Sequence, residues 1–259
     1  MYKSLNIKGK LYGDGFPKVM SIINLTPDSF FERSRCDLSA AEGADMVDAG
    51  ACSTRPGGEP ASEEDELSRL LGFMPEIMRR YAGLPVSIDT FRPRIAREML
   101  ERYGVDIIND VSGGCDEMFA VCAAHNAAYV LTWPHGGSVS DMLFFFSEKL
   151  DSLSKSGVDD VILDPGFGFG KDVENNYEIA RNMEVLQEFG LPVLAGISRK
   201  RMLWQLLGIS PGESLNATTA LNCMLLERGA DIIRVHDTKE AKEAVAIYRQ
   251  FHKTPCSNS

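Results

Sequence analysis

The residues with the most evident chemistry lie near the end of the chain, in the stretch Asp231-Ile-Ile-Arg-Val-His-Asp237. This short apolar run predicts a buried β-strand. Arg234 and His236 are two positions apart, so on a strand their side chains point the same way. A guanidinium with its fork of N–H donors, beside an imidazole of tunable charge, suits a bound anion. A solvated strand end with incidental charges would give the same pattern, so this motif alone does not show whether the strand end binds an anion.

Seven earlier apolar runs end in polar residues in a similar way, and this repetition favours a functional site. The runs are short and bounded by Gly and Pro, as expected for strands buried on both faces of a parallel sheet. Polar groups gathered at one opening are unfavourable unless a ligand or mutual pairing satisfies them. A hydrogen-bonded polar plug is the alternative explanation. The polar residues concerned are Asn24, Thr54, Arg55, Asp89, Asn109, Thr132, Asp164, Ser198, Arg199, Lys200, Arg234 and His236.

Eight such strands alternate with amphipathic helices, which in one chain of 259 residues predicts a (β/α)₈ TIM barrel. An open doubly wound sheet is the alternative architecture. We expect a single domain over residues 1–259, with a hairpin at the barrel bottom within residues 1–17 and a loose tail at 254–259. The expected strands are 18–23, 44–48, 85–89, 105–109, 127–132, 161–164, 192–197 and 231–235, and the expected helices are 62–81, 92–103, 116–125, 141–155, 173–189, 213–228 and 239–251.

The connection after the first strand departs from this scheme. Residues 36–43 are too few for the helix that normally connects parallel strands, because such a crossover takes about a dozen residues. We therefore expect a short or truncated first crossover. A short crossover would impair closure of the preceding loop, residues 26–35, and therefore turnover.

Composition excludes several classes of protein. A formal net charge of -10 and a pI of about 5.0 argue against a general binder of nucleic acid or acidic membranes. An anionic substrate would therefore need a locally positive pocket. No run of about 18 apolar residues exists, and the N-terminus lacks the apolar segment of a signal peptide. The six cysteines form no CxxC pair and show no metal-ligand spacing, so we expect a cytoplasmic protein.

Seven short motifs follow one another in register between about residues 18 and 240. They are Asn-Leu-Thr-Pro-Asp-Ser-Phe (24–30), Ser-Thr-Arg-Pro-Gly (53–57), Ser-Ile-Asp-Thr (87–90), Ile-Ile-Asn-Asp (107–110), Leu-Asp-Pro-Gly-Phe-Gly-Phe (163–169), Ser-Arg-Lys (198–200) and Arg-Val-His-Asp (234–237). Together they resemble the motifs of the dihydropteroate synthases, a family of pterin-binding enzymes. The resemblance implies a (β/α)₈ barrel that joins 6-hydroxymethyl-7,8-dihydropterin diphosphate to p-aminobenzoate. Such a transferase releases diphosphate and yields 7,8-dihydropteroate for folate biosynthesis.

The resemblance also implies roles for individual residues. Asp89, Asn109, Asp164 and Lys200 would bind the pterin and carry catalysis, with Phe169 beside the ring. A carboxylate suits the two donors on one edge of a pterin, and an amide suits the neighbouring ring nitrogens. A dissociative reaction leaves a cation delocalised over the pterin, and preorganised carboxylates near that charge lower the barrier.

The other implied roles concern the second substrate, the leaving group and a metal. Mg²⁺ would be the cofactor, with Asn24 as its protein ligand, because this ion keeps several waters and seldom uses an all-protein cage. Loops 26–35 and 53–58 would close over the substrates, and the family further implies a homodimer and a sulfonamide target. The diphosphate-binding residues would be Thr54, Arg55, Arg234 and His236, and the p-aminobenzoate-binding residues would be Phe30, Pro56, Ser198, Lys200 and Arg201.

The chain departs from the family pattern in places, which leaves two alternatives open. Trp133 replaces a histidine common after the fifth strand, and Arg201 stands where relatives often have serine. One alternative is a pterin-dependent methyltransferase-type barrel, which would share the pterin contacts but would not need the Ser-Thr-Arg-Pro-Gly, Ser-Arg-Lys and Arg-x-His motifs. The other is a degenerate pterin-binding barrel that the short first crossover has made non-catalytic.

Overall fold

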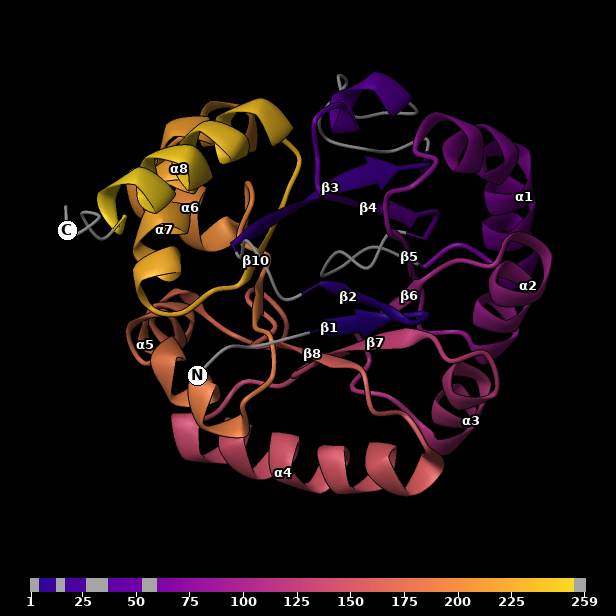
Figure 1. Ribbon diagram of the computed structural model, residues 1–259. Helices are drawn as coiled ribbons and strands as arrows, with labels where there is room; N and C mark the ends of the chain where they lie inside the picture. The colour runs from indigo at the N-terminus through magenta and orange to yellow at the C-terminus, as the bar shows by residue number, and fades with distance from the viewer. Residues whose placement is uncertain (1–4, 13–16, 27–36, 53–59, 254–259) are drawn as a thin grey trace, which may run out of the picture.

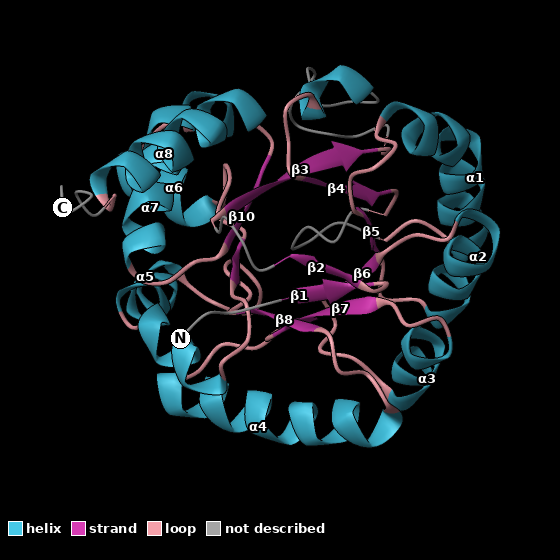
Figure 2. Cartoon of the chain, viewed as in Figure 1, coloured by secondary structure: helices cyan, strands magenta, loops and turns pink. Residues whose placement is uncertain are grey.

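The computed structural model describes residues 5–12, 17–26, 37–52 and 60–253. Within these residues, parallel strands form a ring that is surrounded by helices, as Figures 1 and 2 show. The strands of the ring are β3 (Lys18–Asn24), β4 (Met46–Gly50), β5 (Val86–Asp89), β6 (Ile107–Asp110), β7 (Ala128–Thr132), β8 (Val161–Asp164), β9 (Leu194–Ala195) and β10 (Ile232–Val235).

The order of these strands is that of a barrel. Strands β3 to β8 pair in chain order, and β10 returns to pair with β3 on one side and β9 on the other. A parallel bridge between Leu163 and Val193 joins β8 to the segment before β9 and completes the ring. The (β/α)₈ prediction is therefore confirmed, and the open doubly wound sheet is excluded. The strand expected at 192–197 is shorter, Leu194–Ala195.

The helices lie outside the ring, between successive strands. Ser62 caps α1, since its hydroxyl accepts a hydrogen bond from the Asp65 amide at 3.1 Å, as the Ser-x-x-Asp pattern suggests. The α-helices are α1 (Glu63–Arg80), α2 (Pro93–Tyr103), α3 (Asp116–Ala124), α4 (Val139–Ser156), α5 (Val173–Arg181), α6 (Arg201–Leu207), α7 (Leu215–Glu227) and α8 (Thr238–Phe251), and the 3₁₀ helices are η2 (Leu38–Ala41), η3 (Met183–Phe189) and η4 (Pro211–Glu213).

Two helices differ from the expected ones, and the first crossover agrees with its prediction. The helix expected at 173–189 divides at Asn182, where α5 ends and the 3₁₀ helix η3 begins. Helix α6 was not expected, since it has only 7 residues and follows a polar motif directly. In the described part of the connection between β3 and β4, only the single turn η2 is helical, which agrees with a short first crossover.

A hairpin closes one end of the barrel. Strands β1 (Leu5–Ile7) and β2 (Lys10–Tyr12) pair antiparallel and cross the middle of the ring in Figure 1. Lys8 and Gly9 between them both have positive φ, the geometry of a type I′ turn. Leu5 and Ile7 are buried against the inward-facing residues Met20, Met46, Ile107, Ala128, Val130, Ile162, Leu194 and Ile232. Burying each of these two side chains contributes about 1.5–3 kcal/mol to the stability of the fold. Because this end of the barrel interior is apolar, the inward-facing polar side chains lie toward the opposite end.

The outward-facing residues of the strands form a second apolar cluster with the helices. Val47, Ile88, Ile108 and Leu163 are fully buried between the barrel and its helical layer. A period of two along each strand thus divides the barrel into an inner face and a helix-covered outer face. No helix in the described ranges is both long and apolar enough to cross a membrane.

Candidate active site

The strand alternation brings the predicted site residues to the inside of the barrel. Met20 and Ile107 face inward in the apolar layer at the hairpin end. Asn24 and Asn109 lie an even number of positions further along the same strands, so they face inward at the opposite end. The parallel register places Asp89 directly beside Asn109. In this way one end of the barrel gathers side chains from strands that are far apart in the sequence.

Arg234 on β10 lies at the centre of a buried charge network. Its Nε donates to Asp48 Oδ2 and its Nη2 donates to Asp89 Oδ2, both at 2.6 Å. Asp48 Oδ2 also accepts from Asn109 Nδ2 at 2.9 Å, so one carboxylate oxygen orients two of the predicted substrate-binding residues. Arg234 is therefore held by two carboxylates, and a ligand would meet the other N–H donors of its fork.

Burial and charge within this network shift the pKa of its members. Burial raises the pKa of Asp89 to about 7, while Arg234 opposes the rise and Asp48 adds to it. Burial lowers the pKa of Arg234, but Asp48 and Asp89 outweigh that effect and raise it above the ordinary value. Arg234 thus stays charged, and Asp89 titrates near neutral pH, as carboxylates at functional sites often do.

Five inward-facing polar atoms are buried without a hydrogen-bond partner within the described ranges. An unpaired buried polar atom costs about 1–3 kcal/mol, and such atoms are rare in folded proteins. A sixth unpaired atom, Asn222 Oδ1, lies apart from these on α7. The five, which we call the polar crescent, come from four adjacent strands, β4 to β7, and this concentration indicates a ligand site. They are Asp48 Oδ1, Ser87 Oγ, Asp89 Oδ1, Asn109 Oδ1 and Thr132 Oγ1.

Asp164 and Lys200 form a second group at the same end of the barrel. Asp164 Oδ1 accepts from the Gly166 amide at 2.8 Å, and burial raises the pKa of Asp164 against the opposing charge of Lys200. Lys200 Nζ donates to the carbonyl of Phe167 and lies 4.7 Å from the centroid of the Phe169 ring. Burial lowers the pKa of Lys200 to about 8, with Asp164 opposing. These groups can therefore present an acceptor, a donor and an aromatic face together.

The loop after Asp164 is organised by Lys171, which is 5% exposed. Its Nζ donates to the carbonyls of Trp133, Gly166 and Phe169 at 3.2, 2.9 and 3.0 Å, and lies 4.3 Å from the Trp133 ring. Burial lowers the pKa of Lys171 to about 7. Gly166 has a φ of +67°, and a Cβ there would lie 2.0 Å from the Trp133 carbonyl oxygen, so only glycine fits. Trp133 is therefore part of the packing that shapes the loop carrying Phe169.

The Ser-Arg-Lys and Arg-Val-His-Asp motifs meet through two further contacts. Ser198 Oγ lies 3.0 Å from His236 Nδ1 and accepts from the His236 amide at 3.2 Å. Arg199 binds both carboxylate oxygens of Asp237, with Nε at 2.9 Å and Nη2 at 2.8 Å. Arg199 thus fixes the chain between Ser198 and Lys200.

A cavity of about 600 Å³ opens at this end of the barrel, a size typical of small-molecule sites. Arg234 and Lys200 line it, which gives an acidic protein the locally positive pocket that an anionic substrate needs. Asn109 and Asp164 are 1% and 5% exposed and do not line the cavity. Of the predicted site residues, those in the lining are Asn24, Asp89, Phe169, Ser198, Lys200, Arg201, Arg234 and His236.

Asn24, the predicted metal ligand, ends β3 and lies in the cavity lining. The described ranges contain no cluster of three or more His, Cys, Asp or Glu side chains that could hold a metal ion. The donor set therefore fits Mg²⁺ only if substrate phosphates and waters supply most of the ligands, an arrangement this ion commonly adopts.

Four predicted site residues lie outside the described residues: Phe30, Thr54, Arg55 and Pro56. The same holds for most of the two loops expected at 26–35 and 53–58, and for the tail at 254–259.

Sequence reasoning missed Asp48, Ser87 and Lys171. Asp48 lies two positions after Met46, so the period of two already placed a carboxylate inside the barrel. Ser87 lies two positions before Asp89 on β5 and could have been found in the same way. Lys171 follows a glycine-rich loop, a context that does not by itself predict a buried ammonium group.

Comparison with known proteins agrees with this geometry. Residues 20–236 match the model of a family described as pterin binding enzyme. The dihydropteroate synthase of Bacillus subtilis (strain 168) is 36% identical over 241 residues, which cover 86% of this chain and 84% of the relative. The chain belongs to the dihydropteroate synthase family. The predicted family and the predicted class, a transferase of folate biosynthesis, are confirmed.

Two solved structures of dihydropteroate synthases show the same fold. The Xanthomonas albilineans enzyme with 4-aminobenzoic acid has a TM-score of 0.90 at 31% identity, covering 98% of this chain and 100% of that chain. The Coxiella burnetii enzyme in complex with pteroic acid has a TM-score of 0.87 at 31% identity, covering 96% and 98%. The dihydropteroate synthase resemblance thus extends over nearly the whole chain.

Proposed function

We propose that the protein condenses 6-hydroxymethyl-7,8-dihydropterin diphosphate with p-aminobenzoate, forming 7,8-dihydropteroate and diphosphate. One observation carries this proposal: Asp89, which belongs to the polar crescent, lines the same cavity as the cations Arg234 and Lys200. A flat heterocycle with several polar edge atoms and an anionic leaving group would use both features. A barrel that bound only an apolar ligand would have no use for five unpaired polar atoms.

The pterin ring would be bound by Asp164, Asn109 and Lys200. The Asp164 carboxylate would accept from the 2-amino group and the ring N–H of the pterin. Asn109 Nδ2 already donates to Asp48, so its unpartnered Oδ1 would accept a further pterin N–H. Lys200 would exchange its bond to the Phe167 carbonyl for one to the pterin carbonyl, with Phe169 beside the ring.

The reaction would begin with loss of the leaving group. The bond between the pterin methylene carbon and the diphosphate oxygen breaks, and both of its electrons leave with diphosphate. The resulting cation is delocalised over the pterin, and the ionised Asp89 carboxylate stabilises it electrostatically. The amino nitrogen of p-aminobenzoate then forms the new carbon–nitrogen bond and loses a proton to solvent. With a pKa of about 7, Asp89 is partly ionised at neutral pH before substrate binds.

The departing diphosphate would be bound by Arg234 and His236, together with Thr54 and Arg55. Mg²⁺, held by Asn24 with phosphate oxygens and waters, would neutralise negative charge on the leaving group. Arg234 suits this role because, among the described residues, its two carboxylate partners accept only from Nε and Nη2.

The p-aminobenzoate would lie against Ser198, Lys200 and Arg201, with Phe30 and Pro56 completing the pocket. Arg201 is exposed at the start of α6 and lines the cavity, so its guanidinium suits the carboxylate of this substrate. Sulfonamides, as p-aminobenzoate analogues, would compete for the same place.

The chain would act in the cytoplasm as a homodimer. Helices α7 and α8 lie side by side and expose three large apolar side chains, Met224, Ile247 and Phe251. Exposed apolar residues on adjacent helices are typical of subunit interfaces.

A substrate-omission assay tests the proposal. Diphosphate release would be measured with the pterin diphosphate, p-aminobenzoate and Mg²⁺, and then with each component left out. The proposed function predicts release that requires both organic substrates. A methyltransferase-type barrel would release no diphosphate from the complete mixture. A degenerate barrel would bind the pterin diphosphate but would not turn it over. Either of these outcomes would refute the proposal.

A further inference from the structure

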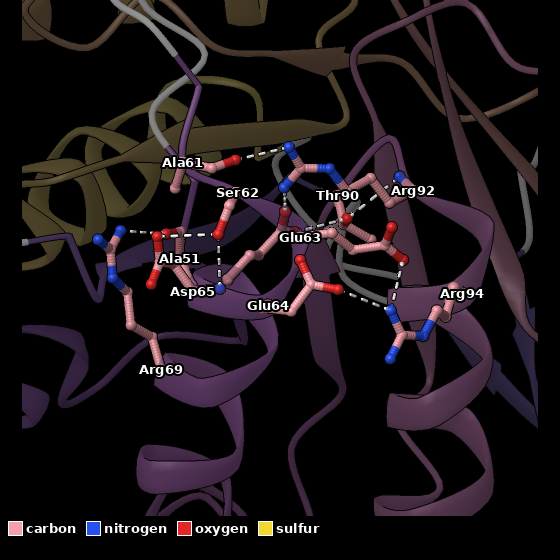
Figure 3. A network of polar contacts seen from close by, with 11 residues as sticks. Ala51, Ala61, Ser62, Glu63, Glu64, Asp65, Arg69, Thr90, Arg92 and Arg94 are labelled. Atoms are coloured by element: carbon pink, nitrogen blue, oxygen red, sulfur yellow. Dashed lines mark hydrogen bonds and ion pairs between the residues drawn. The ribbon is translucent and has the colours of Figure 1, made fainter.

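A buried carboxylate near the cavity takes no part in the proposed reaction. Glu66, in the first turn of α1, is fully buried, which is rare for a glutamate. One of its oxygens accepts from Thr90 Oγ1 at 2.7 Å, and the other is paired with Arg92. Figure 3 shows Thr90 and Arg92 beside Ala61, whose carbonyl accepts from Arg92 Nη2 at 2.6 Å.

This cluster adjoins the proposed site through the end of β5. Thr90 directly follows Asp89, and its amide donates to the Asn109 carbonyl at 3.0 Å. The Thr90 hydroxyl donates to Glu66 and accepts from the Arg92 amide at 3.2 Å. The backbone after Asp89 is therefore held by β6 on one side and by the Glu66–Arg92 pair on the other.

We propose that Glu66 is a positioning residue for Asp89, which it holds at the barrel mouth through Thr90. This inference rests on the proposed function, in which Asp89 stabilises the developing cation. A change at Glu66 would release the Thr90 hydroxyl and the Arg92 guanidinium together, and the end of β5 would lose its attachment to α1. Small displacements of a charged group from its reacting partner are enough to slow catalysis.

Glu66 also acts on Asp89 through its charge. Burial is the main cause of the raised pKa of Asp89, and Arg234 on β10 opposes it. The carboxylates of Asp48 on β4, Glu66 on α1 and Asp110 on β6 each add to the rise. Lys200 is a further cation in this region, and the charge of Asp89 raises its pKa. Removal of the Glu66 charge therefore lowers the pKa of Asp89, whereas a general loss of fold stability leaves the pKa of Asp89 unchanged.

The test compares Glu66→Gln with Glu64→Gln. Both substitutions remove one carboxylate from the first turn of α1. Glu64 is exposed, however, and among the residues drawn in Figure 3 its carboxylate pairs only with Arg94, at 3.3 Å. We expect Glu66→Gln to lower kcat about tenfold and to move the acid limb of the rate profile to lower pH, and Glu64→Gln to do neither. An unchanged kcat would overturn the inference. The inference would also be overturned if Glu66→Gln lost activity and had a lower Tm while the acid limb of its rate profile stayed at the wild-type pH.

Two further measurements cover other outcomes. If Glu66→Gln does not fold, Thr90→Ser should retain wild-type kcat and Thr90→Val should not; equal rates for the two would overturn the inference. If the wild-type protein releases no diphosphate, the proposed function is refuted, but the effect of Glu66 on Asp89 can still be tested. The carboxyl carbon of Asp89 can then be titrated by NMR, with Asp89→Asn to assign it, and the same pKa in wild type and in Glu66→Gln would refute the positioning role.

Discussion

The substitution Asp48→Asn tests the organisation of the barrel interior. Asp48 is fully buried, and its Oδ2 accepts from both Arg234 and Asn109, at 2.6 and 2.9 Å. Asparagine has nearly the same shape and keeps one oxygen acceptor, so the change removes charge without leaving a cavity. We expect weaker binding and slower turnover of the pterin diphosphate and little effect on p-aminobenzoate.

The size of the effect follows from the two hydrogen bonds. A hydrogen bond to a charged group contributes about 1.5–3 kcal/mol and a neutral one about 0.5–1.5 kcal/mol, so the bond from Asn109 loses about 1–1.5 kcal/mol. We expect a loss of similar size, about 1–1.5 kcal/mol, for the bond from Arg234, which loses its ionic partner. Together they give about 2–3 kcal/mol, which corresponds to a loss of roughly 30- to 150-fold in kcat/KM. Because the Asp48 charge raises the pKa of Asp89, its removal leaves more Asp89 ionised. That gain opposes the loss and is limited near neutral pH, where Asp89 is already partly ionised.

The assay measures kcat and KM for each substrate, with Asp45→Asn as the matched control. Asp45 immediately precedes the same strand and also pairs with a cation, Lys242 at 3.0 Å, but it does not line the cavity. Its substitution should lower the Tm and leave the kinetic constants unchanged. Wild-type kcat/KM in Asp48→Asn, or an equal rise in KM for both substrates, would refute the idea that Asp48 organises the pterin diphosphate site.

Three further predictions concern the groups that would contact substrate. Lys200→Ala and Asp164→Ala should each lower turnover more than tenfold in steady-state assays, since each lost interaction is worth above about 1.4 kcal/mol; unchanged kinetics would mean that the site lies elsewhere. Arg234→Ala should raise the KM for the pterin diphosphate but not for p-aminobenzoate, and equal losses for both would contradict its role at the diphosphate. The rate profile of kcat/KM should be bell-shaped with limbs near pH 7 and pH 8. Asp89 loses its charge as the pH falls through its pKa, and Lys200 loses its charge as the pH rises through its pKa; a profile flat from pH 6 to 9 would exclude both assignments.

The fold could be predicted from the sequence because apolar runs and amphipathic helices alternate without interruption. The end of β8 at Asp164 coincides with the expected one, since a Pro-Gly pair stops the strand there. The lack of a full helix in the first crossover was also predicted, from the few residues (36–43) that follow the loop expected at 26–35. By contrast, α6 lies directly after Lys200, and a helix of two turns has too short an apolar pattern to be recognised before its packing is known.

Many residues of the site could be predicted from the sequence, but the hydrogen bonds and ion pairs between them could not. Arg234 was expected to be an anion-binding group, but its pairing with Asp48 and Asp89 from two other strands was not predicted. Such pairing depends on which strands meet across the barrel interior, and side-chain periodicity alone does not specify that. Glu66 was hidden for the same reason, because its burial comes from the packing of α1 against the end of β5.

A crystal structure with the bound pterin diphosphate tests the central claim most directly. The account predicts that the pterin edge lies within hydrogen-bond distance of Asp164 and Asn109 Oδ1, and that the diphosphate lies against Arg234 in the same cavity. A complex in which Asp164 and Arg234 face different cavities, or in which the polar crescent stays without a partner, would contradict it.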